Sequence, residues 1–186
     1  DADHLLSLYT YNNGDEFLST ISEDEDYYIV PSNSYHKLNW EELEDDRNFE
    51  NTESDLTFTG ELRPEQKDTV DQFFKRGRAR SGILQAPCGW GKTFTGCDII
   101  SRNKTVGIYK SVYNSRDKLS DKISLLLVDE AHLCPADMFS TALNSINAKI
   151  KIGISATPRR KDGKHVFLSD YFSPFLVIAK DPRKLD

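Results

Sequence analysis

The sequence has few cysteines and no long apolar run. Its three cysteines, Cys88, Cys97 and Cys134, are an odd number without paired spacing, which favours a reduced, intracellular protein over a disulfide-linked one. The longest apolar stretch, Leu125–Val128, is far shorter than the ~20 residues that a membrane span needs, so we expect no membrane partner. The acidic, polar opening Asp1–His4 does not have the pattern of a secretory signal.

Charge is divided unevenly along the 186 residues. Residues 1–60 carry 16 acidic and 2 basic residues, a balance of −14, whereas residues 61–186 carry 14 acidic and 22 basic residues, a balance of +8. The net charge of −6 therefore hides a basic second part. Such a part is typical of a nucleic-acid partner, although bases scattered over a solvated surface give the same count.

The composition also separates an acidic leading segment, residues 1–55, from the rest. Within it Leu6–Tyr11 alternates like a strand, and Tyr27–Val30 is aromatic and branched. A turn signal, Asn12–Asp15, lies between these two patches, and residues 41–56 have the weak pattern of a linker. We expect either a small β-containing module or a poorly ordered arm.

Apolar strands alternate with amphipathic helices from residue 56 onward. This order predicts an α/β fold with a mostly parallel sheet that carries helices on both faces. Arg63–Gln66 opens the first helix with Pro in its first turn, and the cations of Lys75–Arg80 are expected to close it. The expected strands are 82–86, 106–109, 125–128 and 150–154, and the further expected helices are 92–100 and 138–146.

The segment Ala86–Thr93 has the pattern of a phosphate-binding loop. It follows an apolar strand and opens a helix, which is the context that such a loop requires, although Ala86 stands where the commonest pattern has its first glycine. Lys92 offers a positive charge to phosphate oxygens, and the Thr93 hydroxyl fits the coordination shell of Mg²⁺. The residues predicted to bind the nucleotide from this loop are Pro87, Cys88, Gly89, Trp90, Gly91, Lys92 and Thr93.

Two acids, Asp129 and Glu130, follow the apolar strand 125–128 directly. Carboxylates at the end of a buried strand are costly unless they are paired or hold a metal. We expect Asp129 to hold Mg²⁺ and Glu130 to orient and deprotonate an attacking water, so that these two and Lys92 are the predicted catalytic residues. His132 beside them is either a structural histidine or a link between the nucleotide site and motion.

Taken together, these motifs resemble those of superfamily 2 helicases with an Asp-Glu-Ala-His motif. The stretches 62–66, 77–82 and 87–89 are similar to the XPB-like branch of DNA helicases and translocases, and 155–163 also resembles phage and viral members. The motifs that carry the resemblance are Gln66, Ala86–Thr93, Asp129–His132 and Ser155–Thr157.

The resemblance covers roughly residues 56–180 and implies that 56–186 is a first RecA-like, P-loop ATP-binding domain. It implies ATP and Mg²⁺ as cofactors, nucleic acid as a partner with DNA favoured over RNA, and a second RecA-like domain beyond this chain. By this resemblance Arg63 and Gln66 bind the nucleotide, Gln66 reading adenine. The residues that it assigns to coupling hydrolysis with strand movement are His132, Ser155 and Thr157.

The function so predicted is an ATP-dependent DNA helicase or translocase, of which this chain is the nucleotide-binding half and weakly active alone. Arg159, Arg160, Lys161 and Lys164 are candidates for phosphate contacts, or form a solvated basic loop. One alternative is a non-catalytic module that binds ATP or a partner protein. Another is the motor part of a restriction-type nuclease.

One departure from the helicase pattern concerns the stretch between Lys92 and Asp129, which is much shorter than in those helicases. The strand and helix with a backbone-gripping motif have no residues left after Lys104. We therefore predict a chain break, or an engineered or natural deletion, near Lys104–Thr105. The alternative is a reduced sheet in which Val106–Tyr109 lies beside the phosphate-loop strand.

Overall fold

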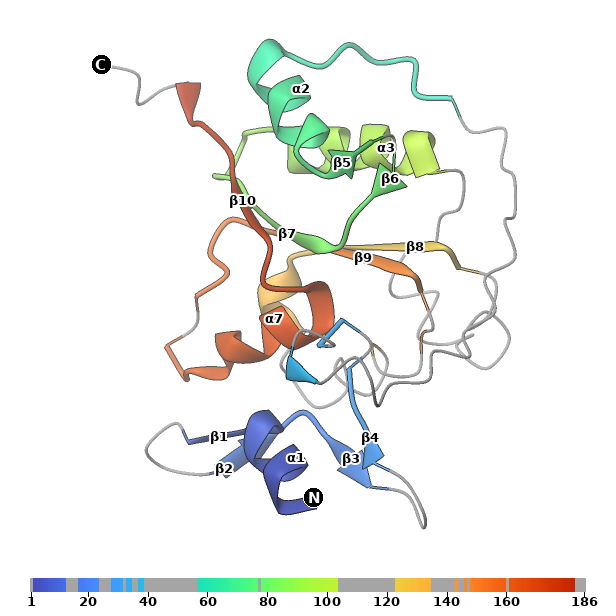
Figure 1. The fold of residues 1–186 in the computed structure, drawn as a ribbon. Helices are drawn as coiled ribbons and strands as arrows, with labels where there is room; N and C mark the ends of the chain where they lie inside the picture. The colour runs from blue at the N-terminus through green and yellow to red at the C-terminus, as the bar shows by residue number, and fades with distance from the viewer. Residues whose placement is uncertain are drawn as a thin grey trace.

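A computed structural model describes residues 2–12, 17–23, 28–31, 33–34, 37–38, 57–76, 78–103, 123–134, 143, 146, 148–159 and 161–182. The predicted break at Lys104–Thr105, the strand 106–109, the linker 41–56 and most of the helix 138–146 lie outside these residues. The described elements (Figure 1) are α1 Ala2–Tyr9, β1 Thr10–Asn12, β2 Phe17–Ser19, β3 Ser22–Glu23, β4 Tyr28–Ile29, α2 Pro64–Asp71, β5 Phe74–Lys75, β6 Arg78–Ala79, β7 Gly82–Gln85, α3 Lys92–Asn103, β8 Leu125–Asp129, η3 Ala131–Leu133, β9 Ile150–Ser155, η4 Lys164–Val166, α7 Phe167–Phe172 and β10 Leu176–Ile178.

The main sheet has four parallel strands in the order β10-β7-β9-β8. Gln85 at the end of β7 pairs with Ser155 at the end of β9, and Asp129 at the end of β8 pairs with Ile154. The segments that follow β7, β8 and β9 therefore leave the same edge of the sheet. This arrangement confirms the predicted α/β fold with a parallel sheet, and it is consistent with the expected RecA-like domain.

Both faces of this sheet are buried, which explains why its strands read as continuous apolar runs. Helices α2 and α3 lie on one face and α7 lies on the other (Figure 1). The cluster on the first face contains Val70, Phe73, Leu84, Ala86, Trp90, Ile99, Leu125, Ile152, Ile154, Val177 and Ala179. The cluster on the second face contains Ile83, Ile123, Leu126, Val128, Ala131, Cys134, Leu143, Ile146, Ala148, Phe167, Leu168, Tyr171 and Phe172.

Two local predictions were wrong. Leu6–Tyr9 belongs to helix α1 and not to a strand, because its apolar residues also recur at the three- and four-residue spacing of a helix. The cations of Lys75–Arg80 do not close α2, which ends at Asp71. They form instead the hairpin of β5 and β6, where Arg76 adopts a left-handed φ of 53°.

The acidic N-terminal segment packs against α7 through one buried carboxylate, Asp170. Nζ of Lys37 lies 2.7 Å from Oδ1 of Asp170, and the hydroxyls of Tyr11 and Thr20 donate to Oδ2 at 2.7 and 3.0 Å. Asp170 is fully buried, and the ring of Tyr11 also meets Phe167 edge-on. Polar and aromatic contacts therefore join the N-terminal segment to α7.

Candidate functional site

The phosphate loop joins β7 to α3, and two glycines give it its path. Gly89 and Gly91 have φ values of 74° and 94°, a left-handed region that side chains other than glycine rarely adopt. A Cβ added at Gly89 would meet no atom within 4 Å, so the backbone there faces open space. Half-buried Lys92 begins α3, whose N-terminal N–H groups and dipole favour an anion. The loop therefore has the cradle that a polyphosphate needs.

Thr93 and Asp129 meet at this cradle, although 36 positions separate them in the sequence. The Thr93 hydroxyl lies 3.3 Å from Oδ2 of Asp129, while Oδ1 accepts the N–H of Glu130 at 2.9 Å. A hydroxyl and a carboxylate oxygen on one exposed spot fit Mg²⁺, which takes few protein ligands and fills its octahedron with water and phosphate oxygens. The described residues hold no cluster of three or more His, Cys, Asp or Glu side chains, and a magnesium site of this kind requires none.

A second cluster joins the two predicted coupling motifs. Nδ1 of His132 lies 3.0 Å from the Ser155 hydroxyl and 3.2 Å from Oε2 of Glu130. The Ser155 hydroxyl also accepts the N–H of Thr157 at 3.2 Å. Glu130 itself has a left-handed backbone with φ 53° and ψ 45°, and it turns the chain from β8 into η3. The structure thus brings Glu130, His132, Ser155 and Thr157 into one hydrogen-bonded row.

The sequence did not single out Gly153, which makes this row possible. A Cβ at Gly153 would lie 2.8 Å from the Cβ of Ala131 and 3.1 Å from Cδ2 of Phe172. Only glycine in the middle of β9 therefore lets η3 and α7 approach the sheet so closely. A glycine inside a strand pattern is the signal that could have revealed this packing.

Arg63 and Gln66, predicted to bind the nucleotide, contact the phosphate loop. The Arg63 guanidinium and the Gln66 amide donate to the carbonyl of Trp90, with Nη2 at 2.7 Å and Nε2 at 3.0 Å. Oε1 of Gln66 in turn accepts the N–H of Arg63 at 3.0 Å. Trp90 itself is buried in the core, so its ring does not face the cradle. Nucleotide contacts of Arg63, Gln66 and Trp90 stay predictions.

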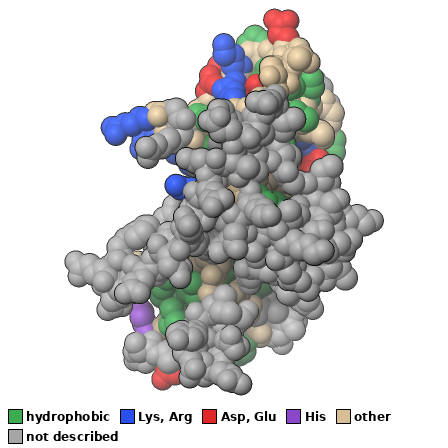
Figure 2. Space-filling view, turned by 90° about the vertical axis from the view of Figure 1, so that its right-hand side faces the viewer, with side chains coloured by type: hydrophobic (Ala, Val, Ile, Leu, Met, Phe, Trp, Pro, Cys, Tyr) green, Lys and Arg blue, Asp and Glu red, His purple; other side chains and the backbone are tan. Residues whose placement is uncertain are grey.

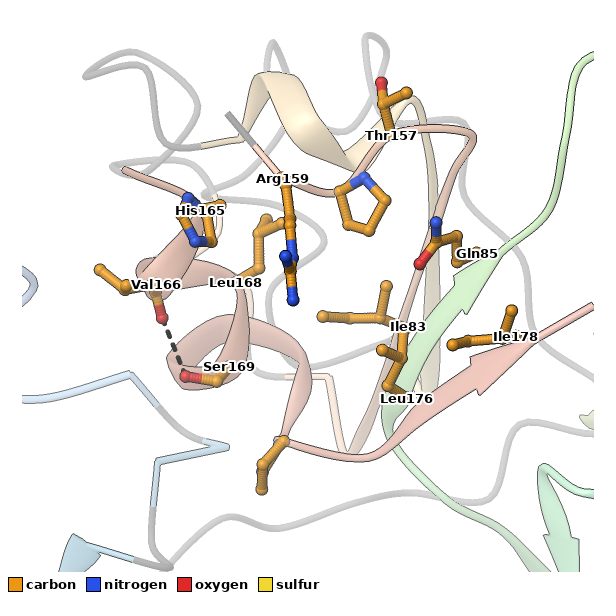
Figure 3. Close-up of a pocket in the computed structure, with 12 residues that line it drawn as sticks. Ile83, Gln85, Thr157, Arg159, His165, Val166, Leu168, Ser169, Leu176 and Ile178 are labelled. Atoms are coloured by element: carbon orange, nitrogen blue, oxygen red, sulfur yellow. Dashed lines mark hydrogen bonds between the residues drawn. The ribbon is translucent and has the colours of Figure 1, made fainter. Parts of the chain in front are cut away.

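A pocket of about 630 Å³ lies beside the loop that follows Ser155, and the sequence did not predict it. Its floor is aliphatic, with Ile83 from β7 and Ile178 from β10, and Arg159 points into it (Figure 3). Ile178 is 65% exposed, so the described residues cover the sheet only in part at its outer strand, β10. The other lining residues are Gln85, Thr157, Pro158, His165, Val166, Leu168, Ser169, Pro174 and Leu176.

Among the described candidates for phosphate contacts, Arg159 lines this pocket, whereas Lys161 and Lys164 do not. Arg159 and Lys161 are exposed and Lys164 is half-buried, whereas Arg160 lies outside the described residues. The described basic and acidic side chains on the face in Figure 2 are mixed at the end that carries α2, and form no single-sign patch there. No helix among the described residues is long and apolar enough to cross a membrane.

One family model and several known proteins match this chain. Residues 101–160, which include the Asp-Glu-Ala-His and Ser-Ala-Thr stretches, match the family described as the res subunit of type III restriction enzymes. The XPB/SSL2 helicase/translocase subunit of general transcription and DNA repair factor IIH from Saccharomyces cerevisiae is 26% identical over 96% of this chain and 27% of its own length.

Two further relatives come from a virus and a fish. A protein of Acanthamoeba polyphaga mimivirus, named as a candidate ATP-dependent RNA helicase, is 27% identical over 85% of this chain and 40% of its own length. The XPB subunit of Danio rerio is 27% identical over 67% of this chain and 23% of its own length.

The parallel sheet is consistent with a RecA-like helicase domain, and these matches show that the chain is similar to XPB-type helicase subunits and to a viral relative. Its resemblance to the XPB-like branch and to viral helicases, predicted from the motifs, is confirmed. The chain spans less than half the length of each of these relatives, which is consistent with a first RecA-like domain only.

Proposed function

We propose that this chain is the nucleotide-binding half of an ATP-dependent helicase or translocase that moves along DNA. The observation that carries the proposal is the 3.3 Å approach of the Thr93 hydroxyl to the Asp129 carboxylate, because it joins the phosphate loop to the acidic motif at one cation-sized site. The similarity to XPB-type and viral helicases supports the same reaction class.

The chain's residues divide the work in this proposal. Lys92 binds phosphate oxygens, and Thr93 and Asp129 hold Mg²⁺, which would neutralise charge on the transferring phosphoryl group. The Glu130 carboxylate accepts a proton from the attacking water. Because that carboxylate also lies near His132, a change at Glu130 reaches Ser155 and Thr157 through hydrogen bonds.

The proposal is tested by nucleotide binding. Lys92→Ala should abolish Mg·ATP binding without changing the melting temperature, since Lys92 lies at the loop and outside the apolar clusters. Lys75→Ala, which removes an exposed cation from β5, is the matched control and should bind like the parent. Equal calorimetric affinities for the parent and the Lys92 variant would rule out the site.

Hydrolysis should be very slow for the 186-residue chain alone, even with DNA. The arginine that a second RecA-like domain supplies is worth ~10³–10⁵ in rate in comparable phosphoryl-transfer enzymes. In the full-length protein, Glu130→Gln should bind ATP but not turn it over. Rapid DNA-stimulated turnover by the short chain would refute a half-motor.

DNA is the proposed track, because one relative's name includes DNA repair and residues 61–186 are basic. Arg159, Lys161 and Lys164 would contact phosphates, so affinity should fall steeply with salt. Competition between DNA and RNA of one sequence measures the preference, and tighter RNA binding would contradict it. We propose an intracellular location, supported by the cysteine pattern and by these relatives.

A second candidate is the motor part of a restriction-type nuclease, which the match of residues 101–160 favours. Both candidates share the nucleotide site. They differ in DNA cleavage, so an ATP-dependent cut of duplex DNA by the full-length protein would select the nuclease. A non-catalytic module would instead bind ATP without DNA-stimulated turnover in any length of chain.

A further inference from the structure

Trp90 has an unusual setting for a residue of a phosphate loop. It stands between the two left-handed glycines, Gly89 and Gly91, where the backbone has most freedom. Its side chain is nevertheless only 2% exposed and lies in the apolar cluster beneath α2 and α3. The buried ring of Trp90 thus anchors a stretch of backbone in which both neighbouring residues are glycine.

The backbone of Trp90 is fixed from the side of α2. Its carbonyl accepts both Nη2 of Arg63 and Nε2 of Gln66, at 2.7 and 3.0 Å. A Cβ at Gly91 would lie 2.6 Å from Nε2 of Gln66, so the glycine is needed for this close approach. Arg63 and Gln66, at the start of α2, therefore fix the position of the loop backbone at Trp90.

The indole of Trp90 is fixed from the opposite side, by the segment that follows β10. Nε1 donates to the carbonyl of Lys180 at 2.9 Å, and the neighbouring N–H of Ala179 donates to the carbonyl of Gln85 at 2.8 Å. Lys180 also lines a hollow of about 480 Å³ with Gln85, Pro87, Ala156, Ile178, Ala179 and Asp181. This hollow shares Gln85 and Ile178 with the pocket of Figure 3.

We propose that Trp90 is a positioning residue that ties the phosphate loop to residues 179–181, so that nucleotide binding and the position of that segment depend on each other. Nucleotide binding restricts the motion of the phosphate loop. Because the indole N–H of Trp90 donates to the carbonyl of Lys180, it restricts the motion of residues 179–181 as well. Coupling of this kind is reciprocal, so whatever displaces residues 179–181 weakens nucleotide binding. The inference rests on the proposed nucleotide site.

A purely structural role for a buried tryptophan predicts a different result. Trp90→Phe keeps an aromatic ring in the core and leaves the backbone carbonyl to Arg63 and Gln66, but it removes the N–H that Lys180 accepts. We expect this variant to bind Mg·ATP about 2–10-fold more weakly, the range for one lost hydrogen bond. Ile99→Val trims the same apolar cluster away from the loop and should leave the affinity unchanged.

Hydrogen exchange supplies the second measurement. Mg·ATP should slow amide exchange at residues 179–181 in the parent and in Ile99→Val, and should not slow it in Trp90→Phe. Because Trp40 is the only other tryptophan, Trp40→Phe leaves Trp90 as the sole indole, and its emission should change saturably with Mg·ATP.

The outcomes separate the two proposals. If the parent shows no Mg·ATP binding beyond that of Lys92→Ala, the nucleotide site and the coupling both fail. If the parent binds and Trp90→Phe matches it in affinity and in exchange at 179–181, only the coupling fails. Weaker binding by Trp90→Phe and Ile99→Val alike would show a general effect of core packing and would also overturn it.

Discussion

The acidic segment within residues 2–38 and the RecA-like part within 57–182 are held by different forces. The first has only two-stranded sheets, and three of its polar side chains converge on a single carboxylate, that of Asp170. The second buries a four-stranded parallel sheet between two apolar clusters. Apolar packing tolerates small losses, whereas a buried charge does not, so the contacts with Asp170 are expected to dominate the attachment of the first region, which Asn33 supports by donating to the carbonyl of Tyr171 at 2.8 Å.

The largest effect is expected from Asp170→Ala. It leaves the Lys37 ammonium buried without its partner, so the free energy of unfolding should fall by ~3–5 kcal/mol. Urea unfolding measures the loss, and limited proteolysis should cut the N-terminal segment first. Asp68→Ala, at an exposed site on α2, is the control. A loss equal to the control's would mean that Asp170 does not hold the two regions together.

Gly153→Ala tests the apolar side of the comparison. The added methyl meets Ala131 and Phe172, and overpacking of this kind destabilises by ~1–3 kcal/mol. Since η3 must shift, Mg·ATP-dependent turnover of the full-length protein should fall as well. Thermal melting and turnover of Gly96→Ala, whose Cβ would meet Leu127 at a looser 3.3 Å, provide the comparison. Unchanged melting of the Gly153 variant would contradict the close packing.

The two regions are expected to lose stability at different alkaline pH values, because a thiol titrates in one and tyrosines titrate in the other. Burial raises the pKa of Cys134 to about 12, and burial also raises the pKa values of Tyr9 and Tyr11. The native state keeps protons that the unfolded chain loses, so stability is complete below the unfolded pKa values and falls as pH rises. From pH 8 to 10 we expect a loss of ~1–2 kcal/mol, mainly from the thiol.

The tyrosines of the N-terminal segment add to this loss only above about pH 10, where phenols ordinarily titrate. Urea unfolding at a series of pH values checks the order. Cys134→Ala should remove the decline between pH 8.5 and 9.5, and a variant with the full decline there would disprove its origin in the core thiol.

The smallest effect is expected from Tyr11→Phe. The ring stays against Phe167, but Asp170 loses one donor, so the free energy of unfolding should drop by ~0.5–1.5 kcal/mol. Chemical unfolding of the parent and the variant measures it. A drop as large as that for Asp170→Ala would show that Tyr11 and not Lys37 dominates the attachment.

Much of the RecA-like part was predictable from sequence, because its strands and motifs can be recognised from short stretches of neighbouring residues. Strands buried on both faces are apolar runs, and the phosphate loop, acidic motif and Ser155–Thr157 each follow such a run. The shared edge of these strands then follows from parallel pairing. The sheet topology therefore predicts that Thr93 and Asp129 lie near each other. It does not predict the distance between the Thr93 hydroxyl and the Asp129 carboxylate.

The remaining features depend on contacts between distant residues. Asp170 and Lys37 are far apart in the chain, and neither has a motif around it. Lys151 interrupts the apolar pattern of β9 and yet is buried, because its Nζ donates to the carbonyl of Leu143 at 2.8 Å. The hydrogen bond from Trp90 to Lys180 joins the phosphate loop to the segment after β10, a strand that the sequence did not predict.

The left-handed backbone of Glu130 creates a conflict between thermal stability and catalytic activity at one position. Glycine would adopt φ 53° freely, whereas a side chain there forfeits ~1–2 kcal/mol. Selection of variants for heat resistance alone would therefore enrich glycine at 130 and discard the carboxylate nearest His132. An engineer who wants a hardier protein must look for gains elsewhere, because the easiest gain at this turn removes the proposed base.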